Sequence, residues 1–185
     1  MAERKWVFIL AVSCFFLGLI VNEYAASRAC PKPSCVDSAR VIPVTDRGYH
    51  KEALKIIRGA EESIHIASFE LKYYEKYPDS SMNEIIMELV KAYERGVDVQ
   101  IVVDEYSSEN NAYHILDEYG IPWRFDGKSV TTHSKLIIID GRIVLLGSTN
   151  LSYYGLEKNN EANILVMDEK TGKYYEEYFQ ELWRN

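Results

Sequence analysis

The strongest constraint on the fold is an alternation of two apolar patterns from residue 41 to the end of the chain. Runs rich in β-branched residues indicate strands, and between them lie segments whose apolar residues recur at helical spacing. We expect strands at 41–44, 63–69, 97–103, 121–125 and 163–167, and helices at 48–60, 80–95, 109–119 and 170–184. This order predicts an α/β domain in which helices flank both faces of a mixed β-sheet.

A β-hairpin is predicted where two apolar runs flank Asp140-Gly141, in the segment KLIIIDGRIVLLGS over 135–148. An Asp-Gly pair suits the tight turn between antiparallel strands because both residues tolerate a positive φ. A two-residue loop would place Ile139 opposite Arg142. The expected role of Asp140 is therefore to shape the turn.

Four polar side chains gather at the open end of this hairpin. Continuing the register places His133 opposite Ser148. Lys135 shares the face of His133, and Asn150 lies diagonally beyond them. Lysine, serine and asparagine supply donors for the oxygens of a phosphodiester, and an imidazole can attack phosphorus or carry protons near neutral pH. Since no carboxylate cluster accompanies them to hold Mg²⁺, we expect chemistry that needs no metal and no other cofactor.

These residues belong to a longer motif, His133-x-Lys135, Asp140 and Gly147-Ser148-x-Asn150. The motif resembles the HxKxxxxDxxxxxxGSxN signature of the phospholipase D superfamily at every fixed position. From about residue 41 the chain is similar to the small single-motif branch, which includes bacterial periplasmic endonucleases and a mitochondrial membrane-anchored member. The resemblance implies a phospholipase D-like fold and a phosphodiesterase activity.

The resemblance also implies a role for each site residue. The catalytic residues are His133, which attacks phosphorus and forms a phosphohistidine, together with Lys135 and Glu161. Glu161 lies eleven residues after Asn150 and orients His133. Lys135, Ser148 and Asn150 bind the substrate phosphate.

The family's chemistry uses two such histidines, one as nucleophile and one as acid for the leaving group. This chain carries one motif, because none of His50, His65 and His114 is followed two residues later by lysine. We therefore expect a homodimer with a composite active site, in which a two-fold axis places two copies of His133 across one cleft.

A membrane segment is expected at the amino terminus, within residues 1–27. Residues 6–21 carry no charge and lack the polar face of a soluble helix. Arg4 and Lys5 precede them, so the positive-inside rule places the catalytic domain outside the cytoplasm, tethered to the cell membrane by a single-pass anchor. The alternative is a signal peptide, cleaved near Ala25-Ala26-Ser27, that releases a secreted or periplasmic protein.

A proline-containing linker is expected at 28–40, followed by the catalytic domain at 41–185. Cys30 and Cys35 lie in this linker and could form a local disulfide outside the cytoplasm. A zinc site would need two further ligands, and no second cysteine pair follows.

Two enzymatic functions and one binding function remain open on these residues. The first is an endonuclease on DNA or RNA, and the alternative is a phospholipase D-type hydrolase or transferase on a phospholipid such as cardiolipin. The third is a protein that grips phosphodiesters without turnover. The formal net charge of −7 excludes a histone-like, wholly electrostatic binder of nucleic acid. A local basic rim could override that average, from Arg124, Lys128, Lys135 and Lys158.

Two further segments are notable for their aromatic or acidic residues. The tyrosine-rich loop over 73–77 could stack bases, meet lipid or pack on its own domain. Asp104 and Glu105 end a strand at the cleft edge, and we assign them no chemistry.

Overall fold

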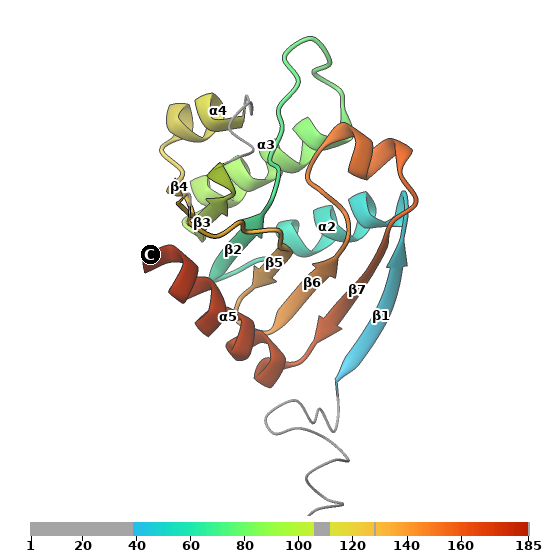
Figure 1. Cartoon of the computed structure of the whole chain (residues 1–185), viewed down its shortest axis with the longest axis vertical. Coiled ribbons are helices and arrows are strands. Elements are labelled where there is room, and N and C mark those ends of the chain that lie inside the picture. The colour runs from blue at the N-terminus through green and yellow to red at the C-terminus, as the bar shows by residue number, and fades with distance from the viewer. Residues whose placement is uncertain (1–38, 106–111, 128, 185) are drawn as a thin grey trace, which may run out of the picture. The chain divides into compact units, whose positions relative to one another are not determined.

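Seven strands form one mixed sheet in the order β1-β7-β6-β5-β2-β3-β4 (Figure 1). The computed structural model describes residues 39–105, 112–127 and 129–184. The elements in chain order are β1 (Arg40–Thr45), α2 (Gly48–Arg58), β2 (Ser63–Ser68), α3 (Ser81–Glu94), β3 (Asp98–Val103), α4 (Ala112–Tyr119), β4 (Trp123–Phe125), β5 (Lys135–Ile139), β6 (Ile143–Gly147), the π-helix η2 (Tyr154–Lys158), β7 (Ala162–Met167) and α5 (Glu169–Arg184).

The pairing between neighbouring strands changes from antiparallel to parallel once across the sheet. β2, β3 and β4 run parallel to one another and are connected through helices, as parallel strands require. The remaining neighbours, from β2 through β5, β6 and β7 to β1, are antiparallel. The predicted mixed sheet is confirmed, and each expected strand or helix has its counterpart in the structure.

Helices cover both faces of the sheet, as predicted. On one face, α2 and α3 bury aliphatic side chains such as Ile57 and Ile86 against the larger core. On the other face, α5 inserts Phe179 over a smaller cluster. His65 lies on that second face, 4% exposed and stacked on Phe179 with ring centroids 4.7 Å apart. Its Nδ1 lies 2.7 Å from a carboxylate oxygen of Glu176, so this histidine is a packing residue.

The start of α3 follows the expected capping signals. The hydroxyl of Ser80 accepts a hydrogen bond from the backbone N–H of Asn83, which satisfies one of the free donors at a helix start. Gly96 follows the helix with a φ of 88°, a conformation that suits glycine.

The predicted register of the β5–β6 hairpin is wrong by one residue. Ile139 pairs with Ile143 and not with Arg142, so the loop contains three residues, 140–142. The turn itself is as expected, with positive φ at Asp140 and Gly141. The backbone carbonyl of Arg142 accepts a hydrogen bond from the N–H of Asp168, which lies between β7 and α5.

This shift changes which residues face each other at the open end of the hairpin. Continued beyond the paired residues, the observed register places Ser134 opposite Ser148 and His133 opposite Thr149. The predicted His133–Ser148 pair is therefore displaced by one position.

Asp140 fastens the hairpin turn to the start of β2. Its side chain is 2% exposed and accepts hydrogen bonds from the backbone N–H groups of Glu61, Glu62 and Ser63. Burial raises the pKa of Asp140, but these N–H donors and Arg142 lower it more, so the pKa lies below its usual value. Asp140 therefore acts in the fold, as the sequence predicted, and holds two strands in place.

Asp140→Ala is expected to destabilise the chain by about 1–3 kcal/mol, because three N–H groups lose their acceptor. Asp140→Asn keeps the positive-φ tolerance and loses only the charge, so it should cost less. Because the pKa of Asp140 is lower in the folded state, its carboxylate stabilises the fold fully above the unfolded-state pKa of about 3.9. This stabilisation is lost as the pH falls through the folded-state pKa. Urea unfolding at neutral and acidic pH checks both points. Equal stability of all three proteins at pH 7 would contradict this role.

The predicted membrane segment and most of the linker, with Cys30 and Cys35, lie outside the described residues. Among the helices that the structure does describe, none is both long enough and apolar enough to cross a membrane.

Candidate active site

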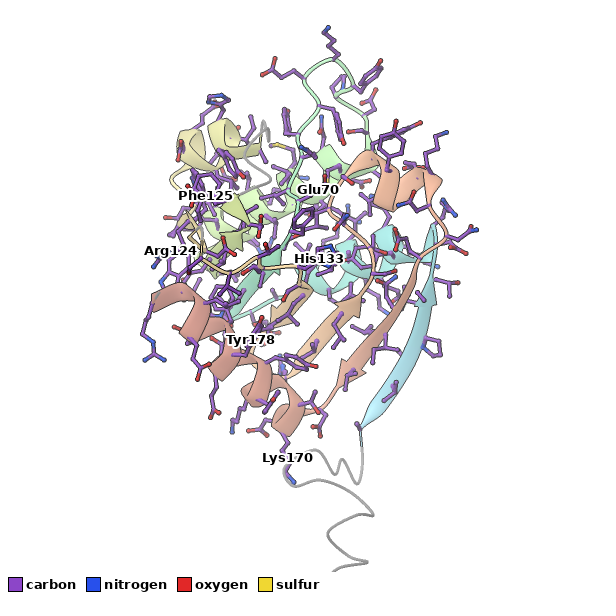
Figure 2. All side chains as sticks on the ribbon, viewed as in Figure 1. Glu70, Arg124, Phe125, His133, Lys170 and Tyr178 are labelled. Carbon is purple, nitrogen blue, oxygen red and sulfur yellow. The ribbon has the colours of Figure 1, made fainter. Side chains whose placement is uncertain are left out.

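Apart from Asp140, the motif residues lie at one edge of the sheet because their strands are antiparallel neighbours. β5 begins at Lys135, β6 ends at Gly147 and β7 begins at Ala162, so these three ends lie side by side. β2 ends on the same edge, with Ser68 paired to Lys135. Figure 2 shows His133 at this end of the strands, with Glu70 beyond it.

His133 is exposed at the mouth of a hollow. Its ring lies against Phe69, with ring centroids 4.9 Å apart and planes tilted by 57°. A cavity of about 380 Å³ opens beside it, bounded on one side by three tyrosines of α5, Tyr174, Tyr175 and Tyr178. The imidazole is therefore accessible to a substrate and is steadied on one side by an aromatic ring.

Two carboxylates hold the segment that precedes His133. The backbone N–H of Thr132 lies 2.8 Å from an oxygen of Asp104 and 2.8 Å from an oxygen of Asp126. Asp104 is fully buried and follows β3, and Asp126 follows β4. The ends of two further strands thus help to position the histidine.

Lys135 is 8% exposed and carries its charge into the site. Its Nζ donates to the backbone carbonyl of His133 at 2.8 Å and lies 5.2 Å from the centre of the Phe69 ring. Burial lowers the pKa of Lys135, and the nearby carboxylates of Glu70, Glu161 and Asp104 oppose this effect only in part, so the pKa lies below its usual value. A bound anion would compensate for the cost of burying this ammonium.

Ser148 and Glu161 are joined across the ends of β6 and β7. The Ser148 hydroxyl donates to Glu161 and accepts from the backbone N–H of Ala162 at 3.1 Å. The other carboxylate oxygen of Glu161 accepts from the side chain of Asn159 at 2.9 Å. Within the described part of the chain, neither oxygen of Glu161 bonds His133. The geometry thus ties Glu161 to Ser148, and its expected role of orienting His133 remains a proposal.

Asn150 presents a buried polar atom without a partner. Within the described residues, its Oδ1 makes no hydrogen bond. The role of Asn150 as a phosphate ligand, which the motif implies, therefore stays a prediction. The backbone of Asn150 is held closely by η2, since a Cβ added to Gly155 would lie 2.2 Å from the Asn150 carbonyl oxygen.

The motif gave no signal for Phe69, Glu70 and Asp126, which also belong to this edge, nor for a role of Asp104 in positioning Thr132. Three of these four residues immediately follow a strand, and Glu70 follows Phe69. The signal that could have found them is the strand order, because it shows which strand ends lie next to one another at one edge of the sheet.

The predicted basic rim is only partly present. Lys135 belongs to the site, and the Nζ of Lys158 lies 5.3 Å from the centre of the Tyr153 ring. The guanidinium of Arg124 donates to the backbone carbonyl of Trp183 at the end of α5, so it is not free to line a cleft. Lys128 lies outside the described residues.

Among the described residues, no group of three or more His, Cys, Asp or Glu side chains is placed to hold a metal ion.

Comparisons with known proteins agree on one family. Residues 53–183 match the family described as "Cardiolipin synthase, PLD-like domain". The chain is 27% identical to the mitochondrial cardiolipin hydrolase of Xenopus tropicalis over 146 residues, which cover 77% of this chain and 64% of that protein. The chain therefore spans somewhat less than two thirds of that curated relative.

Solved structures show the same fold. Nuc of Salmonella typhimurium, described as a phospholipase D family member, superposes with a TM-score of 0.69 at 27% identity, over 80% of this chain and 95% of Nuc. NucT of Helicobacter pylori superposes with a TM-score of 0.63 at 24% identity, over 80% of this chain and 97% of NucT. The described domain is thus close in extent to these two small proteins.

Proposed function

This chain belongs to the phospholipase D superfamily, and from that premise we propose that it is a metal-independent phosphodiester hydrolase that cleaves DNA or RNA internally. The observation that carries the proposal is the gathering of an exposed imidazole, a buried ammonium and a hydroxyl–carboxylate pair at one open edge of the sheet. These groups come from β5, β6 and β7, which the fold places side by side.

The proposed reaction has two displacement steps. A ring nitrogen of His133 attacks phosphorus, and the bond from phosphorus to the leaving oxygen breaks to give a phosphohistidine. The His133 of a second copy protonates that oxygen as it leaves. The second imidazole then takes a proton from water, the water oxygen attacks phosphorus, and the bond to His133 breaks. Lys135, Ser148 and Asn150 would supply donors to the phosphate oxygens throughout.

The exposed apolar side chains of the described residues favour nucleic acid over lipid as substrate. Six of the nine exposed large apolar side chains in the described residues are tyrosines, and none is leucine or phenylalanine. Tyrosine faces can stack on bases, whereas a surface that enters lipid is typically rich in leucine, phenylalanine and tryptophan. We therefore place the nuclease function first.

A phospholipid remains the second candidate because a specific relative supports it. The mitochondrial cardiolipin hydrolase of Xenopus tropicalis is named for a phospholipid substrate. The predicted anchor within 1–27 would hold the catalytic domain beside a bilayer, where such a substrate is concentrated. The chemistry at His133 would be the same for either diester.

A panel of substrates tests the two functions. The full-length chain is incubated with single-stranded DNA, single-stranded RNA and cardiolipin vesicles, each with and without EDTA. We expect internal cleavage of a nucleic acid that survives chelation. Release of phosphatidic acid without nucleic-acid cleavage would instead assign the lipid function, and binding without turnover of any substrate would refute an enzyme.

We also propose that the active unit is a homodimer, because one chain supplies one histidine of the required pair. Wild-type chain and His133→Ala chain, each with its own tag, are co-expressed in equal amounts. If every site needs two intact copies of His133, activity per total protein should fall to about one quarter. Tandem purification on both tags shows that mixed dimers form. A fall to one half, with mixed dimers present, would show that each chain acts alone.

A further inference from the structure

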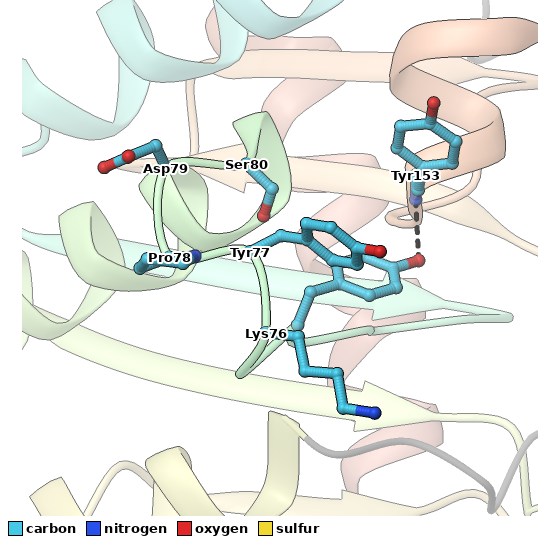
Figure 3. Close-up of a pocket in the computed structure, with 7 residues that line it drawn as sticks. Lys76, Tyr77, Pro78, Asp79, Ser80 and Tyr153 are labelled. Atoms are coloured by element: carbon cyan, nitrogen blue, oxygen red, sulfur yellow. Dashed lines mark hydrogen bonds between the residues drawn. The ribbon is translucent and has the colours of Figure 1, made fainter.

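A second cavity lies between the loop after β2 and Tyr153, the residue before η2. Its volume is about 700 Å³. Figure 3 shows the residues that line it, Tyr74, Lys76, Tyr77, Pro78, Asp79, Ser80 and Tyr153. The proposed reaction uses none of them. From their chemistry we propose that this cavity binds a nucleobase of a single-stranded substrate next to the phosphate that is cleaved.

Both walls of the cavity lie close in sequence to residues of the active site. Tyr74 follows Phe69, the ring that contacts His133, by five residues, and Tyr153 follows Asn150 by three. Leu71 and Leu151 form a parallel bridge, and the N–H of Lys72 donates to the Leu151 carbonyl at 3.0 Å. Both walls of the cavity are therefore joined to segments that carry site residues.

The loop that forms one wall is rigidly held, which lowers the entropy cost of binding. The buried side chain of Asn83 bonds the backbone N–H and carbonyl of Tyr74 and the carbonyl of Tyr77. The hydroxyl of Tyr74 accepts from the backbone N–H of Tyr153 at 2.8 Å and so links the two walls. Tyr77 presents the most exposed ring in the cavity, whereas the ring of Tyr153 is already contacted by the Lys158 ammonium, whose Nζ lies 5.3 Å from the ring centre.

Tyr77 is 68% exposed and Tyr153 is 39% exposed, although both line a cavity. Exposed aromatic faces held in place are the feature that proteins use to stack bases of single strands. The exposed ammonium of Lys76 on the same wall can meet a neighbouring phosphate. The exposed carboxylate of Asp79 adds a polar group that can accept a hydrogen bond from the edge of a base.

The test uses the full-length chain and two oligonucleotides of equal length, one with normal bases and one in which every nucleotide is abasic. Stacking on one aromatic ring contributes about 1–3 kcal/mol, which corresponds to a factor of roughly 5–150 in binding. Wild type should therefore cleave the normal strand with a kcat/KM higher by such a factor. In Tyr77→Ala this preference should collapse toward unity, and in Tyr77→Trp it should persist. Tyr119→Ala, an exposed tyrosine on α4, is the matched control and should keep the preference.

This inference rests on the proposed nuclease function, and the outcomes separate the two. If wild type cleaves bis-p-nitrophenyl phosphate but neither oligonucleotide, the nuclease function fails and the inference falls with it. If wild type cleaves both oligonucleotides equally well, or if Tyr77→Ala keeps the wild-type preference, the nuclease function stands and the base-binding cavity is wrong. Loss of cardiolipin cleavage in Tyr77→Ala, with the oligonucleotide preference intact, would assign the cavity to lipid.

Discussion

Replacing His133 by alanine is expected to lower kcat by at least about 10⁴-fold on every diester that the chain cleaves, because both displacement steps need this imidazole. The exposed ring of His133 packs on Phe69 and closes no core, so the variant should fold like wild type. Steady-state kinetics on a labelled oligonucleotide and on bis-p-nitrophenyl phosphate measure the loss. The two substrates test whether the loss is general.

A covalent intermediate distinguishes a nucleophile from a general base. With a ³²P-labelled substrate, alkaline quenching of wild type during turnover should leave label on the protein, and His133→Ala should leave none. His114→Ala is the matched control, because this histidine lies exposed on α4 and outside the motif. A His133→Ala chain that retained a tenth of the wild-type rate, or still carried label, would remove His133 from the mechanism.

The sequence predicted the elements well because their signals are local. As expected, Ser80 caps the start of α3 and Gly96 follows its end, and Asp140-Gly141 forms the turn between β5 and β6. The predicted register of the β5–β6 hairpin was wrong by one residue. The Arg142 backbone is hydrogen-bonded to Asp168, 26 positions later, and a Cβ on Gly172 of α5 would lie 2.1 Å from the Gly141 carbonyl oxygen. Contacts of that range carry no signal in the hairpin itself.

For the site, too, local features were predictable from the sequence and long-range ones were not. The spacing of the motif predicted that Lys135 and Ser148 would meet, and the antiparallel order of β5 and β6 brings them to one edge. Spacing could not predict that Lys135 would be buried, nor that Asp104 and Asp126 would hold Thr132. Burial and these hydrogen bonds depend on the order of strands across the sheet, which the sequence pattern left open.

Lys135→Met is expected to lower kcat/KM by about 10²–10³-fold, because the site loses a charged donor aimed at the phosphate oxygens. The same change should leave the Tm unchanged or raise it. Burial lowers the pKa of Lys135, so the fold gains nothing from carrying that charge, and methionine has a similar length. A lower Tm together with lost activity would show that Lys135 serves the fold and would contradict a functional charge.

The fall of kcat/KM at alkaline pH tests whether the charge of Lys135, and not only its shape, is needed. An ordinary lysine loses its proton near pH 10.4, and the pKa of Lys135 lies below its usual value because the ammonium is buried. If substrate binding needs the protonated form, kcat/KM of wild type should begin to fall at a lower pH than an ordinary lysine would cause. In Lys135→Arg the limb should move beyond the accessible range, since a guanidinium stays protonated above pH 12. A limb that stays in place would show that another group titrates there, and Lys135 would then have no role as a charged ligand for phosphate.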